Sequence, residues 1–160
     1  MTILINAIIF LSFFVLMEGV AWLTHKYIMH GFLWSLHDDH HLKDHEGFFE
    51  RNDFFFLLFA IPGIALMSFG WFNGYDDFRF WMGAGVTLYG AAYFFVHDIF
   101  IHQRFPLMKQ LNSTYFRALR KAHKVHHKHL SKEEGECFGM LFIPRRYYIE
   151  AKKSKSEFRL

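Results

Sequence analysis

The chain has 160 residues, enough for one domain, and we expect residues 1–160 to form a single unit. Hydrophobic residues make up 52% of it, and its one cysteine, Cys137, excludes an internal disulfide framework and a metal site built from several thiolates. The formal net charge is +3, but the basic residues form no arginine-rich or aromatic platform, so we expect no nucleic-acid partner. A face against anionic lipid headgroups accounts better for the positive charge.

Three stretches of the chain are long and apolar enough to cross a bilayer as helices. Residues 3–24 carry one charge, that of Glu18, whereas residues 54–75 and 80–96 carry none. About 20 apolar residues in a helix span the roughly 30 Å of hydrocarbon in a membrane. We therefore predict an all-α integral membrane protein with three transmembrane helices.

Two other interpretations of these stretches are weaker. A signal peptide could account for the first, but there is no basic region before Ile3 and no small-residue cleavage pattern after it. Buried core helices in a soluble protein could account for all three, but a domain of this size can hardly bury three helices that are apolar all round. Lipid is the better solvent for them.

Local signals predict the remaining elements. Within the second stretch Pro62–Gly63 suggests a kink, and Asn73–Gly74 is a reversal signal before the third stretch. Beyond the third stretch the chain becomes polar, with a predicted helix at 113–128 and a loop at 133–136. Residues 138–143 are too few to span, so we expect them to pack at the membrane interface.

The positive charges orient the helices. If the three thread in order, residues 25–53 and everything after His97 lie on one side, with only the N-terminus and the 73–79 turn opposite. Of the 18 Lys and Arg, three fall in the first of these segments, 14 follow Phe100, and Arg79 alone is opposite. The positive-inside rule then makes the histidine side a cytoplasmic cap.

Histidine is the unusual residue type, with 12 in the chain. Ten of them form two copies of one pattern, a His-x4-His followed by a His-x2-His-His. The first copy is His25, His30, His37, His40 and His41, and the second is His97, His102, His123, His126 and His127. Since the first and third spans each end at a His-x4-His, we expect all ten rings to converge at one cytoplasmic site. The isolated His45 and His129 are expected to be ordinary interfacial residues.

The spacing suggests how the rings point. The first and last histidines of each His-x2-His-His are four apart and share a helix face. The middle ones, His40 and His126, are turned by about 100° from their next neighbours, which suits a second metal or a different direction of coordination. The i, i+5 pairs are splayed by about 140° on a straight α-helix, so they either reach two metals or sit where the helix unwinds.

The type of ligand alone does not determine which metal binds. Neutral imidazole binds Zn, Cu, Fe and Ni, so zinc is an alternative. Iron is favoured because there are enough rings for two ions and because the site lies beside the bilayer, where an apolar substrate can be delivered. Two irons can activate O2 to attack an unactivated C–H bond, whereas zinc has no redox chemistry.

Several carboxylates accompany the histidines. Glu18 lies seven residues before His25 and thus on nearly the same helix face. A carboxylate inside the membrane is costly unless paired, so we expect it behind a metal ligand or in the substrate pocket, with a helix-packing hydrogen bond as the alternative. Asp98 is a second candidate for a partner behind a ligand. Asp38–Asp39 is expected only to solvate its loop.

The chain also resembles a known family. Its histidine segments are similar to those of the bacterial and plastid β-carotene hydroxylases of the fatty acid hydroxylase superfamily, and the resemblance runs from about residue 17 to residue 144. The similar segments are residues 23–30, 37–41, 46–53, 95–106 and 122–127, with Gly135, Phe138, Gly139 and Pro144.

The resemblance implies a non-haem di-iron monooxygenase that hydroxylates C3 of the β-ionone rings, converting β-carotene through β-cryptoxanthin to zeaxanthin. It implies O2 as co-substrate, electrons from ferredoxin or a similar carrier, and all ten motif histidines as iron ligands. There is no plastid-type N-terminal extension, so we expect a multi-pass enzyme of the bacterial inner (cytoplasmic) membrane.

Two alternatives remain. Another member of the superfamily acting on a fatty acyl chain or sterol would have the same ligands. A non-enzymatic metal-binding or metal-transport protein would carry polar ligands at mid-membrane in several helices, whereas here Glu18 is the only intramembrane charge.

Overall fold

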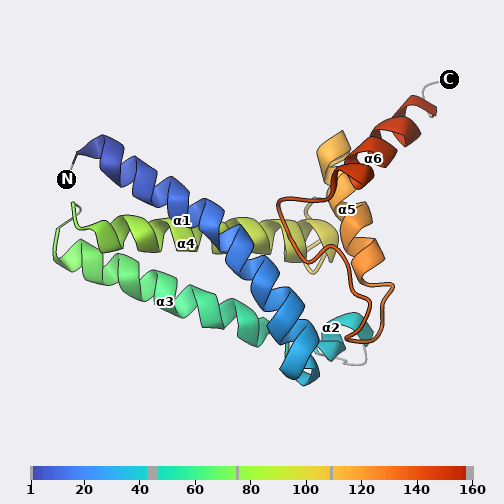
Figure 1. Cartoon of the computed structure of the whole chain (residues 1–160), viewed down its shortest axis with the longest axis horizontal. Helices are drawn as coiled ribbons and strands as arrows, with labels where there is room; N and C mark the ends of the chain where they lie inside the picture. Colours follow the sequence, from blue (N-terminus) through green and yellow to red (C-terminus); the bar gives the residue numbers. More distant parts are fainter. Residues whose placement is uncertain (1, 43–46, 75, 109, 158–160) are drawn as a thin grey trace.

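The computed structural model describes residues 2–42, 47–74, 76–108 and 110–157, so His45 lies outside the described residues (Figure 1). The three long helices are α1 (Ile3–Leu23), α3 (Asp53–Phe72) and α4 (Phe78–Phe94). Within the described ranges there is no strand, so the all-α prediction is confirmed.

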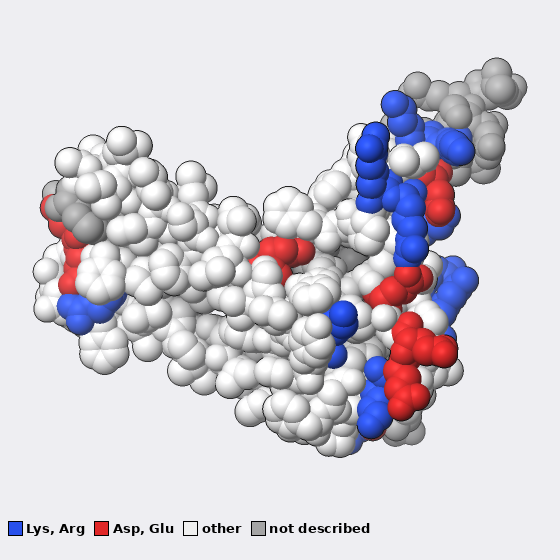
Figure 2. Space-filling model, in the orientation of Figure 1, with Lys and Arg blue, Asp and Glu red and all other residues white. Residues whose placement is uncertain are grey.

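Three helical segments are long and apolar enough to cross a membrane, as predicted. They are Ile3–Phe32, Asp53–Phe72 and Phe78–Ile101. Large apolar side chains point outward from them, and Leu16 and Ile61 are 56% and 63% exposed. In Figure 2 most charged side chains gather at the two ends of the molecule, and the surface between them is uncharged apart from one small acidic patch. This outward-facing apolar surface suits lipid and not water.

Helix α4 is the centre of the bundle, and both α1 and α3 pack against it. Glycines allow the close approach. A Cβ at Gly83 or Gly70 would overlap the backbone of α3 or α4, and one at Gly85 would lie 2.5 Å from the Phe10 carbonyl oxygen of α1. Small residues at helix contacts are the usual solution in membranes, where packing replaces the hydrophobic effect.

The residues within and after α3 explain where this helix ends and the chain reverses. Helix α3 runs unbroken through Pro62, and the kink expected there stays a prediction. It ends at Asn73, whose side-chain amide donates to the Phe69 carbonyl at 2.8 Å, and Gly74 follows with φ +105. A positive φ is easily adopted by glycine, so the predicted reversal at Asn73–Gly74 is confirmed.

Two of the spans change their winding where the histidines begin. Helix α1 continues as the π-helix η1 (Thr24–Phe32), and α4 continues as the π-helix η3 (Phe95–Ile101). In a π-helix the hydrogen bonds join residues i and i+5, so residues five apart fall on one face. Each His-x4-His begins in one of these segments, and the π-helical winding resolves the alternative left open by its spacing.

The polar end is built from short elements. They are η2 (Trp34–Leu36), α2 (Asp38–Leu42), α5 (Thr114–His126) and α6 (Arg145–Glu157). Helix α5 matches the predicted helix at 113–128, and residues 133–136 are non-helical as predicted. Helix α6 was not predicted. It packs on α5 through buried small and aromatic side chains, which are Ala118, Ala122, Tyr147 and Ala151.

Candidate metal centre

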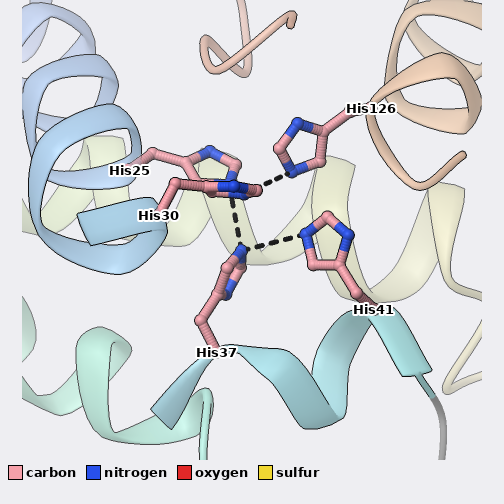
Figure 3. Close-up of side chains that lie close together, drawn as sticks. All are labelled: His25, His30, His37, His41 and His126. Carbon is pink, nitrogen blue, oxygen red and sulfur yellow. Dashed lines mark hydrogen bonds between the residues drawn. The ribbon is translucent and has the colours of Figure 1, made fainter. Parts of the chain in front are cut away.

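The fold brings all ten motif histidines together at the polar end. Nine of them form two clusters, each with ring nitrogens within 4.8 Å of one another. The first cluster is His25, His30, His37, His41 and His126 (Figure 3). The second cluster is His40, His97, His102 and His123. The His127 ring lies between the two, with its centroid 4.6 Å from those of both His41 and His123.

Each His-x4-His stays within one cluster. The ring centroids of His25 and His30 are 5.2 Å apart, and those of His97 and His102 are 4.5 Å apart. A straight α-helix would splay such pairs, whereas the π-helical winding of η1 and η3 aligns them. Single π-helical turns in longer helices are often found at functional sites.

Each His-x2-His-His is instead divided between the clusters. His37 and His41 point into the first cluster, and His40 between them points into the second. On α5 the division is reversed, with His126 in the first cluster and His123 in the second. The approximately 100° turn between neighbouring helix positions therefore places the clusters side by side.

Backbone carbonyls hold four rings of the first cluster. Each ring's Nδ1 lies between 2.9 and 3.3 Å from a carbonyl oxygen in the segment that follows α5. The pairs are His25 with Phe138, His30 with Lys132, His41 with His129 and His126 with Glu136. His129, expected to be an ordinary interfacial residue, thus contributes its carbonyl oxygen to this arrangement.

These carbonyls determine which ring nitrogen carries the proton. A carbonyl oxygen only accepts, so each of the four Nδ1 atoms donates and each Nε2 presents a lone pair. The Nε2 atoms of His30 and His126 face each other at 3.3 Å. Burial, reinforced by neighbouring imidazoles, lowers the pKa of His126 to about 2 and that of His41 to about 4, so both rings are neutral at pH 7.

Converging neutral imidazoles of this kind fit a transition-metal ion. Two lone pairs that face each other repel, and a cation between them turns that repulsion into coordination. Imidazole nitrogens suit Fe, Zn, Cu and Ni, and two adjacent clusters match two ions. The ligand role of the ten histidines stays a prediction, but the donor atoms are placed for it.

Carboxylates stand behind the second cluster. The Nδ1 of His40 lies 2.6 Å from Glu50 Oε2, and the Nδ1 of His97 lies 3.1 Å from Asp98 Oδ2. Arg104 donates to Asp98 at 2.9 Å. Asp98 therefore lies behind a ring of the second cluster.

Sequence reasoning missed Glu50, Asn52 and Arg104. Asn52 Oδ1 lies 2.7 Å from the Nδ1 of His37. The available signal was their position: Glu50 and Asn52 immediately precede the second span, and Arg104 follows the third, all on the histidine side.

Glu18 supports the first histidine cluster indirectly, through the segment that follows α5. The carboxylate is buried, accepts from the Tyr89 hydroxyl at 2.7 Å and accepts from each backbone N–H of residues 140–142 at 2.9 Å. It thus anchors the segment whose Phe138 carbonyl meets His25. Its bond to Tyr89 also joins α1 to α4, which was the alternative expected for it. In this segment Met140 is buried and Phe142 is exposed, and the expected packing of residues 138–143 at the membrane interface stays a prediction.

The expectation for Asp38–Asp39 was wrong for Asp39. That side chain is 2% exposed, and its carboxylate accepts from the backbone N–H of Arg51 at 2.6 Å. Asp38, by contrast, accepts from the exposed Arg51 guanidinium at 2.8 Å. Because Asp39 immediately precedes His40 on α2, its bond to Arg51 fixes α2 against the loop that carries Glu50.

An apolar cavity leads from the membrane-spanning region to both clusters. It lies among α1, α3 and α4, and its walls include Met17, Ala21, Phe55, Phe56, Phe59 and Tyr93. It also touches His25 of the first cluster and His97 of the second. A bound apolar group would therefore lie beside both histidine clusters at once.

Membrane-spanning helices that end in two histidine clusters define a class of protein, the integral membrane oxidoreductases with a histidine-rich metal site. The model of the fatty acid hydroxylase family matches residues 10–144. The chain therefore belongs to the fatty acid hydroxylase family, and the predicted resemblance is confirmed.

Several curated proteins are similar to this chain over most of its length. The chain is 39% identical to a β-carotene hydroxylase of Pseudescherichia vulneris, over 92% of this chain and 82% of the relative. It is 41% identical to the β-carotene hydroxylase of Pantoea ananas, over 87% of this chain and 78% of the relative. A β-carotene hydroxylase of a Paracoccus species is 34% identical, over 87% of this chain and 85% of the relative. No solved structure matches the chain.

Proposed function

We propose that this protein is a non-haem di-iron monooxygenase that hydroxylates C3 of the β-ionone rings of β-carotene, through β-cryptoxanthin to zeaxanthin. The apolar cavity that reaches His25 and His97 carries the proposal, because it can deliver a C–H bond of a lipid-soluble molecule to both clusters. The names of the three bacterial relatives support the choice of substrate.

The ten motif histidines would hold the iron. Two bound irons would supply the activation of O2 that the oxidation of an unactivated C–H bond requires. The protein's part is to present neutral imidazoles: carbonyls fix the tautomer in the first cluster, and carboxylates orient His40 and His97 in the second.

The cavity walls would bind the ring and exclude water. Phe55 is buried and, with Phe56 and Phe59, lines the α3 side, while Met17 and Tyr93 lie opposite on α1 and α4. Within the described residues, α1 and α3 each pack on α4 and not along each other. The polyene would leave the cavity between these two helices and remain in lipid, so the substrate would enter sideways from the bilayer.

The proposal also includes the location of the protein and its electron donor. A single domain of residues 1–160 would lie in the bacterial inner membrane with its clusters on the cytoplasmic side, where 17 of 18 basic residues fall when only Arg79 is opposite. Reduced ferredoxin or a similar carrier would donate electrons there.

The first experiment is expression in a bacterial host that accumulates β-carotene. Chromatography of the pigments is expected to show β-cryptoxanthin and zeaxanthin with the intact chain and only β-carotene with His126→Ala, because this fully buried ring belongs to the first cluster. Zeaxanthin made by His126→Ala would contradict the site. Unchanged β-carotene with the intact, membrane-inserted, iron-supplied chain, together with newly hydroxylated acyl chains or sterols, would contradict the substrate.

A further inference from the structure

The two histidine clusters differ in what stands behind their rings. In the first cluster, four Nδ1 atoms meet backbone carbonyls and that of His37 meets the Asn52 amide oxygen, so all five acceptors are neutral. In the second cluster, His40 meets the Glu50 carboxylate and His97 meets the Asp98 carboxylate. Every group behind the first cluster is therefore neutral, and two groups behind the second are acidic.

The number of rings does not distinguish the clusters. His127 has its Nε2 2.9 Å from the Nε2 of His123, so it can join the second cluster. Each cluster then has five imidazoles. What remains different is the charge of the groups behind them.

An arginine holds the acidic groups in place. The Arg104 guanidinium donates to Asp98 at 2.9 Å and to Asp53 at 2.7 Å, and it lies 3.7 Å from the Glu50 carboxylate. Arginine stays protonated in proteins and presents its donors in a rigid fork. Three carboxylates and one guanidinium thus form a network with a net negative charge beside the second cluster.

Such a network strengthens metal binding. A carboxylate that accepts from the outer N–H of an imidazole raises the basicity of the nitrogen that faces the metal, and it fixes the orientation of the ring. The bond between His40 and Glu50 is short and charge-assisted, which makes it stronger than a bond to a neutral carbonyl. The negative charge also stabilises a nearby cation directly.

We propose that the two metal sites are unequal, and that Glu50 and Asp98, held by Arg104, make the second cluster retain its metal more tightly than the first. Glu50 and Asp98 are positioning residues, because they act through His40 and His97. The inference rests on the proposed two-metal centre. It adds that the two metals dissociate in a fixed order, with the metal in the first cluster leaving first.

The test is metal release from the full-length protein in detergent. The chain is loaded with Zn²⁺, which has no redox chemistry, and release to a colorimetric chelator is followed over time. Two phases of equal amplitude are expected. His126→Ala, which damages the first cluster, is expected to lose the fast phase, and His123→Ala is expected to lose the slow phase.

Two near-isosteric variants then move the phases in opposite directions. Glu50→Gln keeps the shape of the side chain and removes its charge, so the slow phase is expected to accelerate by about 10- to 100-fold while the fast phase is unchanged. Asn52→Asp places a carboxylate behind His37, so the fast phase is expected to slow by a similar factor. Asp98→Asn tests the second cluster independently if Glu50→Gln does not fold.

The outcomes separate this inference from the proposed function. Two metals released at a single rate from the unaltered protein, or a fast phase that accelerates in Glu50→Gln, would overturn the inequality and leave the two-metal centre standing. Fewer than two metals bound per chain would instead overturn the two-metal centre. Neither result depends on the conversion of β-carotene.

Discussion

At the scale of single residues, the buried carboxylate of Glu18 connects the membrane-spanning part of the protein to the histidine site. A carboxylate inside the membrane needs several donors, and this one has the Tyr89 hydroxyl and the backbone N–H groups of residues 140–142. It therefore holds the segment that supplies carbonyls to the first cluster.

Replacing Glu18 with Gln should loosen this segment. The amide places an N–H₂ against backbone N–H groups and removes the charge, so we expect the free energy of unfolding to fall by about 2 kcal/mol. We also expect metal to be lost preferentially from the first cluster, whose rings the segment supports. Thermal unfolding in detergent and metal content after dialysis measure both effects, with the exposed Glu133→Gln as the matched control. Equal stability and equal metal retention in the two variants would remove the proposed anchoring role.

At the scale of elements, the change from α-helix to π-helix and the close packing of helices on α4 determine the site. The π-helical segments η1 and η3 turn each i, i+5 pair onto one face, and the packing of α1 and α3 on α4 sets where η3 begins relative to η1 and to the start of α3. This packing includes a tight contact between α3 and α4 at Gly83.

Gly83→Ala tests that contact. The new Cβ would overlap the Met67 backbone of α3, so the helices must separate, and overpacking of this kind costs about 1–3 kcal/mol. We expect a lower unfolding temperature and less metal bound per chain. Gly19→Ala on α1 is the control, because a Cβ there meets nothing within 4 Å. If Gly83→Ala behaved like the control, the position of η3 would not depend on this contact.

At the scale of the whole molecule, the charged ends and the apolar surface between them place the cavity within the bilayer and the clusters at its edge (Figure 2). This arrangement would let a lipid-soluble substrate reach the proposed metal centre without crossing water. Filling the cavity should therefore reduce turnover without disturbing the clusters.

Ala60→Phe makes this change. Ala60 lines the cavity, so we expect the zeaxanthin yield to fall at least about tenfold, through the steric loss of ring binding, while two metals per chain remain bound. Ile64→Phe on the exposed face of the same helix is the control and should leave the yield unchanged. Pigment chromatography and metal analysis of the same preparations check both halves of the expectation. An unaffected yield in Ala60→Phe would place the substrate elsewhere.

Much of this protein follows from its sequence because the relevant signals are local. Runs of about 20 apolar residues define the three spans, because moving so many apolar side chains from lipid into water costs free energy. The repeated histidine spacing indicates two ions, and its position at the ends of the first and third spans indicates convergence. The turn of about 100° between His40 and His41, which separates them into different clusters, also follows from helix geometry.

Only the tertiary structure decided what lies behind each ring. The carbonyls of Phe138 and Glu136 carry no side-chain signal, and Glu50 meets His40 only because α2 and the loop before α3 are folded together. The cavity likewise needs residues from three helices, so no phenylalanine could be assigned to it from spacing. Local periodicity determines which residues share a face, whereas contacts between distant segments depend on how those faces pack, and these contacts make the two clusters different.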